Sequence, residues 1–515
     1  MKYRLSVGRI RYGLVPVLLL LGGFVGSWSA PLLAGSYTSA VATINRQQLL
    51  RHCQFLASDA LEGRETGTRG GQAAGAYIVA QLRKLKVRPA GADGDYFQPF
   101  QSASRNIICQ LPGSDGALAK EYLIVCAHYD HVGFGNYRNS RGPFGYIHKG
   151  ADDNASGTAA LLELIGAFTS LDTAPKRTLV FIFWDAEEQG LLGSEYWCQS
   201  PTVPLAGLKL VVNIDMIGRL RENRAEVLGA RTAAGLRELI SANNTQPAVA
   251  LSFSWDSRRD SDHYPFFARQ IPYLMVFTGK HPEYHTPYDD VGKLNTEGME
   301  RVTRLLFRTV YAAAQLPNLP PFRQDCLQEN NGARDVAEAP GELPPPRLGV
   351  TWDEERARHE VIEITQVDPA SPAEAAGIRS GDRILKIDGA EVHTPGQMRE
   401  AVCDAPEETT AVVMHRGEAS SRTLRLHLQG PAHPLGIFGR SDGAEPGCVI
   451  VSRVLPGSAA DRAGLRLNDR ICHVGGNSVN FPNELSALLS RRSGQQSIQI
   501  ERDGELQTLQ MTLPR

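Results

Sequence analysis

Four short, nearly continuous apolar runs constrain what the first part of this chain can fold into. In chain order they are YLIVCAHYD, RTLVFIFWDAEE, LKLVVNIDM and IPYLMVFTG. Such runs are typical of strands buried on both faces of a parallel sheet. Stretches of helical periodicity precede and separate them, and the one at 70–85, before the first run, places four aliphatic side chains on a single face: Ile78, Val79, Leu82 and Leu85. The sequence therefore predicts an α/β domain over 47–315, with a mostly parallel central sheet flanked by helices.

The N-terminus has the pattern of an export signal. Four basic residues among the first eleven precede the apolar stretch YGLVPVLLLLGGFVGSWSA, which ends at Ala30 with small residues. Pro31 argues against cleavage directly after Ala30, and the apolar run is about long enough to span a bilayer. We therefore expect residues 1–34 to be a signal peptide or an uncleaved anchor. The protein is expected in the periplasm, the cell envelope or the medium, with membrane contact only through this segment.

Charge and cysteine content argue against nucleic-acid binding and against a cysteine metal site. The formal net charge is −2, so nothing in the composition points to nucleic acid as a partner. The eight cysteines contain no close CxxC pair, which argues against a cysteine metal site. Export permits disulfides, but the sequence leaves their pairing open.

The second half of the chain begins with a change of composition and then repeats itself. Residues 316–346 contain seven prolines and little apolar periodicity, which predicts a linker. Beyond it, PASPAEAAGIRSGDRILKIDGAEV aligns with PGSAADRAGLRLNDRICHVGGNSV at an offset of 87 residues. The simplest interpretation is two copies of one module, at 347–430 and 434–515.

Polar side chains in the first domain fall where the apolar runs end. The ends of the runs, the segment GADDNASG and the segment PEYHTPYDD supply two histidines and six carboxylates: His128, Asp130, Asp152, Asp153, Glu187, Glu188, Asp215 and His285. Since the carboxyl ends of parallel strands share one edge of a sheet, we expect these side chains to lie close together.

Carboxylates crowded in this way need positive charge, and no cluster of lysine or arginine accompanies them. A divalent metal is the natural counter-charge. Imidazole with carboxylate suits zinc, while manganese and cobalt remain open. One bridging carboxylate with four terminal ligands would hold two ions roughly 3.5–4 Å apart. A further carboxylate beside them would act as general base.

The motifs AHYDHVG, GADDNASG, DAEEQGLLGS, NIDM and EYHTPYDD together resemble the signature of the co-catalytic di-zinc aminopeptidases. That family includes secreted bacterial leucyl aminopeptidases, and its relatives include glutamate carboxypeptidase and glutaminyl cyclase. The resemblance covers about 47–315 and implies a zinc-exopeptidase fold with two zinc ions. It implies that Asp152 bridges the ions. His128 and Asp215 would complete one site, and Glu188 and His285 the other.

The resemblance also implies roles beside the ions. Glu187 would be the general base on a metal-bridging water, and Asp130 would hold a ligand imidazole by its second nitrogen. Asp153 would follow a cis peptide bond and help position the bridging ligand. In DSDHYPFFARQIP, His263 or Tyr264 is a candidate for steadying the oxyanion on the substrate side, with a packed aromatic loop as the alternative.

The two repeated modules resemble PDZ domains, which are small, partly open β-barrels. The segments RLGVTW and PLGIFG stand where that fold binds a peptide C-terminal carboxylate on backbone N–H groups, with the peptide adding as a strand. The implied residues are Leu348, Gly349, Val350, Leu435, Gly436 and Ile437. The second copy has LND where the first has SGD. A pair that only packs on the first domain and binds no peptide remains open.

The combined expectation is an exported zinc-dependent aminopeptidase that acts on N-terminal residues of peptides, with PDZ domains for peptides or partners. Three alternatives remain. One is a glutaminyl cyclase with one zinc. Another is a carboxypeptidase, for which Arg219, Arg258 and Arg259 are near enough in sequence to hold a substrate carboxylate. The third is a PDZ scaffold without catalysis, which the presence of Glu187 and all five ligand positions disfavours.

Overall fold

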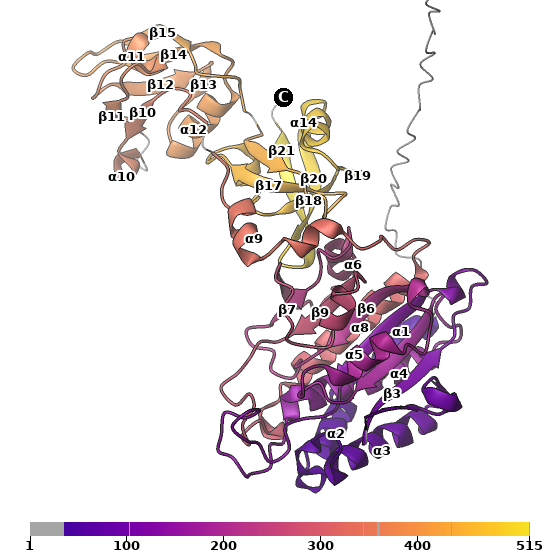
Figure 1. Ribbon diagram of the computed structural model, residues 1–515. Helices are drawn as coiled ribbons and strands as arrows, with labels where there is room; N and C mark the ends of the chain where they lie inside the picture. The colour runs from indigo at the N-terminus through magenta and orange to yellow at the C-terminus, as the bar shows by residue number, and fades with distance from the viewer. Residues whose placement is uncertain (1–34, 102, 343, 358–360, 434, 514–515) are drawn as a thin grey trace, which may run out of the picture. The chain divides into compact units, whose positions relative to one another are not determined.

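Figure 1 presents the computed structural model of the chain. The predicted signal or anchor, residues 1–34, lies outside the described residues. The structure describes residues 35–101, 103–342, 344–357, 361–433 and 435–513. Among these residues, none of the helices combines the length and the apolar character needed to cross a membrane.

A nine-stranded sheet forms the centre of the first domain, in the order β1-β3-β5-β4-β6-β9-β7-β8, with β2 paired to β3. The central strands β5, β4, β6 and β9 run parallel. Antiparallel pairs join β3 to β5 on one side and β7 to β9 on the other. The predicted α/β class is confirmed, and the sheet is mixed, with its parallel part at the centre. The strands are β1 Arg88–Pro89, β2 Phe97–Phe100, β3 Ser104–Leu111, β4 Tyr122–His128, β5 Thr178–Trp184, β6 Leu208–Ile214, β7 Arg224–Leu228, β8 Ala250–Phe253 and β9 Tyr273–Phe277.

The apolar runs are continuous because both faces of the central strands are buried. In β4, Leu123 and Val125 join one core, while Ile124 and Cys126 join the other. The first core contains side chains from α1, α2, α3, α4, α6 and α8, and the second contains side chains from α5 and α7. Figure 1 shows these helices around the sheet. Their bounds are α1 Gly35–Thr43, α2 Arg46–Leu56, α3 Arg69–Lys84, α4 Gly157–Thr169, α5 Leu192–Gln199, α6 Leu236–Ala242, α7 Tyr264–Phe267 and α8 Thr296–Gln315.

The parallel strands deliver polar side chains to one edge of the sheet. Strand β4 ends at His128, and β6 ends one residue before Asp215. Strand β5 ends at Trp184, and Glu187 and Glu188 follow in the next loop. The strand ends therefore bring together the side chains that the sequence predicts as a cluster.

The proline-rich segment after α8 contains local structure. It holds a 3-10 turn, Gln324–Leu327, and the helix α9, Asn331–Ala337. Both Arg231 of the first domain and Arg323 bind the Glu329 carboxylate through paired hydrogen bonds. The backbone N–H of Asn331 donates to Asp256. The beginning of the predicted linker is thus held on the first domain.

The two repeats form antiparallel sheets with the same loop geometry. In the first, Leu348 O accepts from Ala373 N and Gly349 O from Asp368 N. In the second, the residues 87 positions later make the same pair of bonds, Ala460 N to Leu435 O and Leu455 N to Gly436 O. The elements are β10 Val350–Trp352, α10 Glu354–Ala357, β11 Ile364–Val367, α11 Pro372–Ala375, β12 Arg383–Ile387, β13 Ala390–Glu391, α12 Pro395–Asp404, β14 Glu408–Met414, β15 Ser421–His427, β16 Ile437–Arg440, β17 Val449–Val454, α13 Ala459–Arg462, β18 Arg470–Val474, β19 Asn477–Ser478, α14 Pro482–Ser490, β20 Gly494–Arg502 and β21 Glu505–Leu513.

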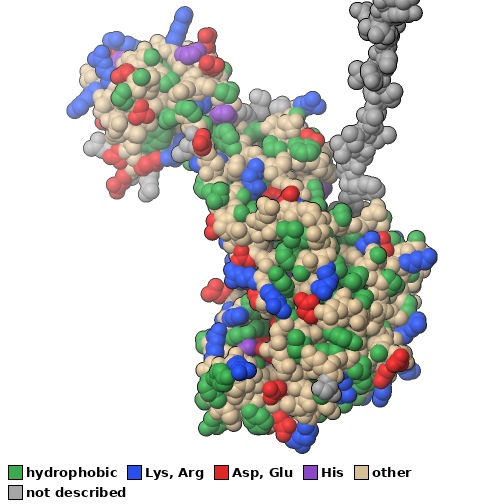
Figure 2. All heavy atoms as spheres, in the orientation of Figure 1, with side chains coloured by type: hydrophobic (Ala, Val, Ile, Leu, Met, Phe, Trp, Pro, Cys, Tyr) green, Lys and Arg blue, Asp and Glu red, His purple; other side chains and the backbone are tan. Residues whose placement is uncertain are grey.

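The described residues include one disulfide, and their surface charges are mixed. Cys448 and Cys472 form a disulfide in the second repeat, and the other six cysteines are free and buried. On the face seen in Figure 2, basic and acidic side chains are interspersed with hydrophobic ones, in keeping with the small net charge.

Candidate metal centre

Asp153 lies at the centre of the polar cluster and faces two groups of side chains. One carboxylate oxygen, Oδ1, lies 3.4 Å from Nε2 of His128, and the same nitrogen is 3.4 Å from Oδ1 of Asp215. The other oxygen, Oδ2, lies 3.0 Å from Nε2 of His285, which is 3.1 Å from Oε2 of Glu188. Asp153 is therefore shared by two sets of nitrogen and carboxylate donors.

A third histidine joins the second set. Nδ1 of His131 lies 2.8 Å from Oε1 of Glu188 and 3.9 Å from Oδ2 of Asp153. These three side chains are close enough to hold one ion together, as are His128, Asp153 and Asp215. The sequence places His131 inside AHYDHVG, three residues after His128, but nothing in the motif alone marks it as part of the cluster.

The donor set fits divalent metal. Asp153, Glu187, Glu188 and Asp215 form no ion pair with lysine or arginine in the described part of the chain. Histidines pair with three of them, and the buried Arg64 interacts electrostatically with Asp153 without an ion pair. Nε2 of His285 is near two carboxylate oxygens yet has no hydrogen-bond partner among the described residues. Imidazole nitrogens and carboxylate oxygens that converge in this way suit a shared cation.

The structure corrects the assignment of the bridging position to Asp152. Asp152 turns away from His128 and His285: its Oδ1 accepts from Gly218 N at 2.6 Å and from Ser156 Oγ at 3.0 Å. Its Oδ2 lies 3.3 Å from Nε2 of His281. The position of the cis peptide bond is corrected as well, because it joins Asp153 to Asn154. Two adjacent aspartates point to opposite sides of the chain, and only the second faces the ligand cluster.

Buried polar contacts hold this turn in place. Asp289 Oδ2 accepts the backbone N–H groups of both Asp152 and Asp153, at 2.9 and 3.0 Å. Arg64 is fully buried and donates to five backbone carbonyl groups, including those of Gly150 and Asp153. Gly150 has a φ of +55°, and a Cβ there would lie 2.2 Å from the Asp153 carbonyl oxygen. The turn therefore requires glycine at this position.

Asp130 adjoins both a predicted ligand and the predicted base. Its Oδ1 lies 3.6 Å from Nδ1 of His128, on the side of the ring away from Asp153. The same carboxylate accepts the backbone N–H groups of Glu187 and Glu188 at 3.1 and 3.3 Å. Burial raises the pKa of the Asp130 carboxyl to about 6, although His128 opposes the shift. Asp130 thus ties β4 to the loop after β5.

Glu187 faces a cavity that begins at the metal cluster. Burial raises the pKa of its carboxyl well above the usual range; His128 opposes this, and neighbouring carboxylates add to it. A carboxylate with a raised pKa is a better proton acceptor, which is what general-base catalysis needs.

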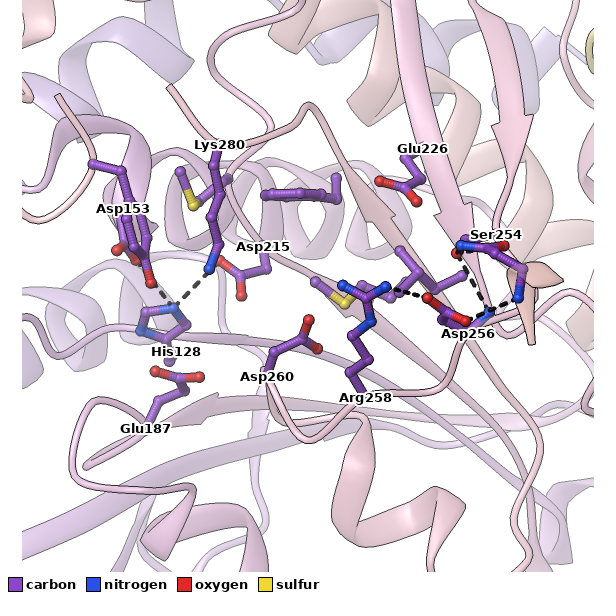
Figure 3. A pocket seen from close by; sticks show the side chains of 16 residues that line it. His128, Asp153, Glu187, Asp215, Glu226, Ser254, Asp256, Arg258, Asp260 and Lys280 are labelled. Carbon is purple, nitrogen blue, oxygen red and sulfur yellow. Dashed lines mark hydrogen bonds and ion pairs between the residues drawn. The ribbon is translucent and has the colours of Figure 1, made fainter. Parts of the chain in front are cut away.

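The cavity has a volume of about 270 Å³ and extends from the metal cluster along the sheet. Figure 3 shows His128, Asp153, Glu187, Asp215 and Lys280 at one end and Glu226, Ser254 and Asp256 at the other, with Asp260 and Arg258 between them. The remaining lining residues are Met216, Leu228, Met275, Phe277, Tyr284 and Asn331. Sequence patterns give no indication of Glu226 or Asn331. Tyr284 lies in the quoted motif, and its ring stacks on His285 at a centroid distance of 3.9 Å.

The two substrate-side candidates do not line this cavity. His263 is fully buried, and its ring stacks on Tyr273 at a centroid distance of 4.5 Å. Burial lowers the pKa of its imidazole to about 3, so the ring is neutral at pH 7. Tyr264 packs against Phe267 at a centroid distance of 6.0 Å. This segment matches the packed aromatic loop that was the alternative expectation.

Two family models match this chain. Residues 106–310 match the model of peptidase family M28, and residues 363–413 and 450–502 match the PDZ domain. The chain is 26% identical over 296 residues to a probable leucine aminopeptidase of Arthroderma otae, which covers 54% of this chain and 75% of that protein. It is 28% identical over 210 residues to aminopeptidase YwaD of Bacillus subtilis, covering 39% of this chain and 43% of that protein.

Among solved structures, the LapA aminopeptidase of Legionella pneumophila is similar to this chain, with a TM-score of 0.45 and 19% identity, covering 55% of this chain and 75% of that one. The chain spans three quarters of the first curated relative and less than half of the second. The two matched models cover the metal cluster and both repeats. The chain therefore carries a peptidase family M28 domain, followed by two PDZ-domain segments.

Proposed function

We propose that this protein is an exported, zinc-dependent aminopeptidase that removes N-terminal residues from peptides. The observation that carries the proposal is the sharing of Asp153 between two donor sets, with Glu187 beside them at the end of a cavity. His128 and Asp215 would hold one ion with Asp153. His285 and Glu188, next to His131, would hold the second. The relatives named aminopeptidases support the same activity.

Divalent ions at this centre would supply positive charge that polarises the peptide carbonyl and makes water more acidic. Glu187 would take the proton from the attacking water and pass it to the leaving amine. Asp130 would fix the His128 ring through Nδ1, leaving Nε2 for the cluster. Asp289 and Arg64 would keep the turn that carries Asp153 in its orientation.

The competing peptidase activity is less well supported. A carboxypeptidase needs a free cation for the substrate carboxylate, and the three arginines considered for it are engaged, which leaves Lys280 as the cavity base without an ion pair among the described residues. Arg219 is paired with Glu283 at 2.7 Å, Arg258 is paired with Asp256, and Arg259 donates to Gly190 O. A glutaminyl cyclase with one zinc would not need two donor sets around Asp153.

The PDZ segments are proposed to bind peptide C-termini. In the first, Leu348, Gly349 and Val350 line a cavity together with Met398 and Val402 of α12. Gly349 has a φ of +74°, and a Cβ there would lie 2.3 Å from Ser371 Cβ. Gly436 has a φ of +63°, and its Cβ would lie 2.1 Å from Ser458 Cβ. Both loops therefore require glycine in a left-handed conformation beside a serine, and the backbone N–H groups of such loops would bind the carboxylate. Full-length protein should bind peptides with a free C-terminus and not their C-terminal amides.

Export is supported by the basic and apolar N-terminal sequence and by the disulfide between Cys448 and Cys472, which forms in oxidising compartments. N-terminal sequencing of protein recovered from fractionated cells would show whether residues 1–34 are removed or retained.

One experiment tests the catalytic proposal. Elemental analysis would count bound zinc, and the same sample would be assayed on aminoacyl-anilides beside N-terminally blocked controls. We expect two metals per chain and cleavage of free-amine substrates only. One metal with cyclisation of N-terminal glutamine would favour the cyclase, and cleavage of blocked substrates would contradict an aminopeptidase.

A further inference from the structure

We infer that the cavity beside the metal cluster selects peptides whose first residue is lysine or arginine. The inference rests on the proposed aminopeptidase function and adds the class of side chain that the enzyme accepts. Three observations carry it: the apolar floor of the cavity, the absence of an ion pair for the Glu226 carboxylate, and the charges of the side chains around that carboxylate.

The floor of the cavity is a patch of the sheet formed by β7 and β9. These strands pair antiparallel, with Glu226 opposite Phe277 and Leu228 opposite Met275. Residues two apart on a strand project to the same face, so all four side chains lie on one surface. Three of them are apolar and the fourth is a carboxylate. A long side chain with an aliphatic stem and a terminal cation is complementary to such a surface.

Glu226 is the charged residue of this surface, and it has no ion-pair partner among the described residues. It is half-buried, and within the described residues its carboxylate makes no hydrogen bond and no ion pair; its electrostatic neighbour Arg258 is ion-paired with Asp256 instead. A carboxylate partly removed from water and left unpaired is costly, and a cation brought by the substrate would offset that cost. Figure 3 places Glu226 at the end of the cavity away from Asp153, where the tip of a long side chain would reach.

The two basic side chains of the cavity do not fill this role. Arg258 pairs with Asp256, which also accepts the backbone N–H of Asn331. Lys280 is exposed, with its ammonium group 4.6 Å from the centroid of the Tyr284 ring. Asp260, which also lines the cavity, is half-exposed and adds a further negative charge. Away from the metal cluster, the carboxylates of Glu226, Asp256 and Asp260 therefore face one base, Arg258, which is already paired with Asp256, and Lys280 lies at the cluster end.

The test compares kcat/KM for the anilides of arginine, lysine, leucine and glutamate, using the zinc-loaded full chain. We expect arginine and lysine to exceed leucine by about 10- to 100-fold, the size of one charge-assisted contact. In Glu226→Gln, the ratio of arginine to leucine should fall by a similar factor. Glu222→Gln, an exposed carboxylate that precedes β7 and does not line the cavity, is the matched control and should keep the wild-type ratio.

Glu226→Lys should shift preference toward the glutamate anilide, and zinc content with the melting temperature would verify that each variant is folded. Preference for leucine in the wild type, or an unchanged arginine-to-leucine ratio in Glu226→Gln, would overturn the inference while leaving the aminopeptidase intact. Preference for glutamate that disappears in Lys280→Gln would also overturn it. Failure to cleave any free-amine substrate would reject the proposed function and the inference together.

Discussion

Nε2 of His285 lies 3.0 Å from Oδ2 of Asp153, on the side of the carboxylate opposite His128. Among the described residues, this arrangement makes Asp153 the side chain shared by both donor sets. Asp152, the preceding residue, instead accepts from the backbone of Gly218 and contacts His281. The two adjacent aspartates therefore have separable tasks, which variants can distinguish.

Asp153→Asn should lose metal from both sites, because the bridging carboxylate loses its charge and one strong donor oxygen. Asp152→Asn should keep two metals per chain, since an amide oxygen can still accept from Gly218 N and Ser156 Oγ. Elemental analysis of both purified variants checks this. Retention of two metals by Asp153→Asn, with loss in Asp152→Asn, would return the bridging role to Asp152.

Glu187→Gln should keep both metals and the melting temperature but lower kcat by about 10²- to 10⁴-fold, because glutamine cannot accept the proton of the attacking water. Single-turnover assays with metal analysis on the same preparation check this. Wild-type turnover in the variant would remove Glu187 from the role of general base.

Removal of metal by a chelator should abolish activity and destabilise the M28 domain, because two buried and two partly buried carboxylates are then left without a divalent counter-charge. Free zinc at 100 times its dissociation constant should restore about 2.7 kcal/mol of folding free energy for one site. Thermal melts across a zinc titration measure this. A melting temperature independent of zinc would show that the cluster holds no ion in solution.

The sequence predicts the parts of this molecule that depend on patterns along the chain. Strands β4, β5, β6 and β9 lie within the four apolar runs, since burial on both faces leaves a continuous signal. The choice between Asp152 and Asp153 could not be made in that way. It depends on a left-handed turn at Gly150, on backbone N–H groups that donate to the Asp289 carboxylate and on hydrogen bonds donated by Arg64, and both residues are distant in sequence.

The cavity was equally inaccessible to sequence patterns. Glu226 sits in a short strand, and only the register of β7 against β9 brings it beside Phe277. Asn331 reaches the cavity from a segment that composition identifies as linker. His263 shows the reverse case, a residue that a motif suggests for the substrate side but that does not line the cavity. It is buried among aromatic side chains, and its imidazole is neutral at pH 7.

Acid should weaken the attachment of the segment after α8. Glu329 is mostly buried, which by itself raises the pKa of its carboxyl, but the hydrogen bonds from Arg231 and Arg323 lower it to about 2. A carboxyl whose pKa is lower in the folded state contributes stability that is fully present above its unfolded pKa, about 4.3, and is lost as the pH falls through 2. Glu329→Gln should therefore be less stable than the wild type by about 1–3 kcal/mol at pH 7.

The difference in unfolding free energy between wild type and Glu329→Gln should shrink as the pH is lowered from 5 to 2, because only the wild type has this carboxyl to protonate. Denaturant titrations at several pH values measure the difference. Glu297→Gln, on the exposed side of α8 and paired only with Arg301 four residues later, is the matched control and should show a small, nearly constant difference. A difference for Glu329→Gln that stays constant down to pH 2 would show that the Arg231 and Arg323 contacts do not hold this segment in solution.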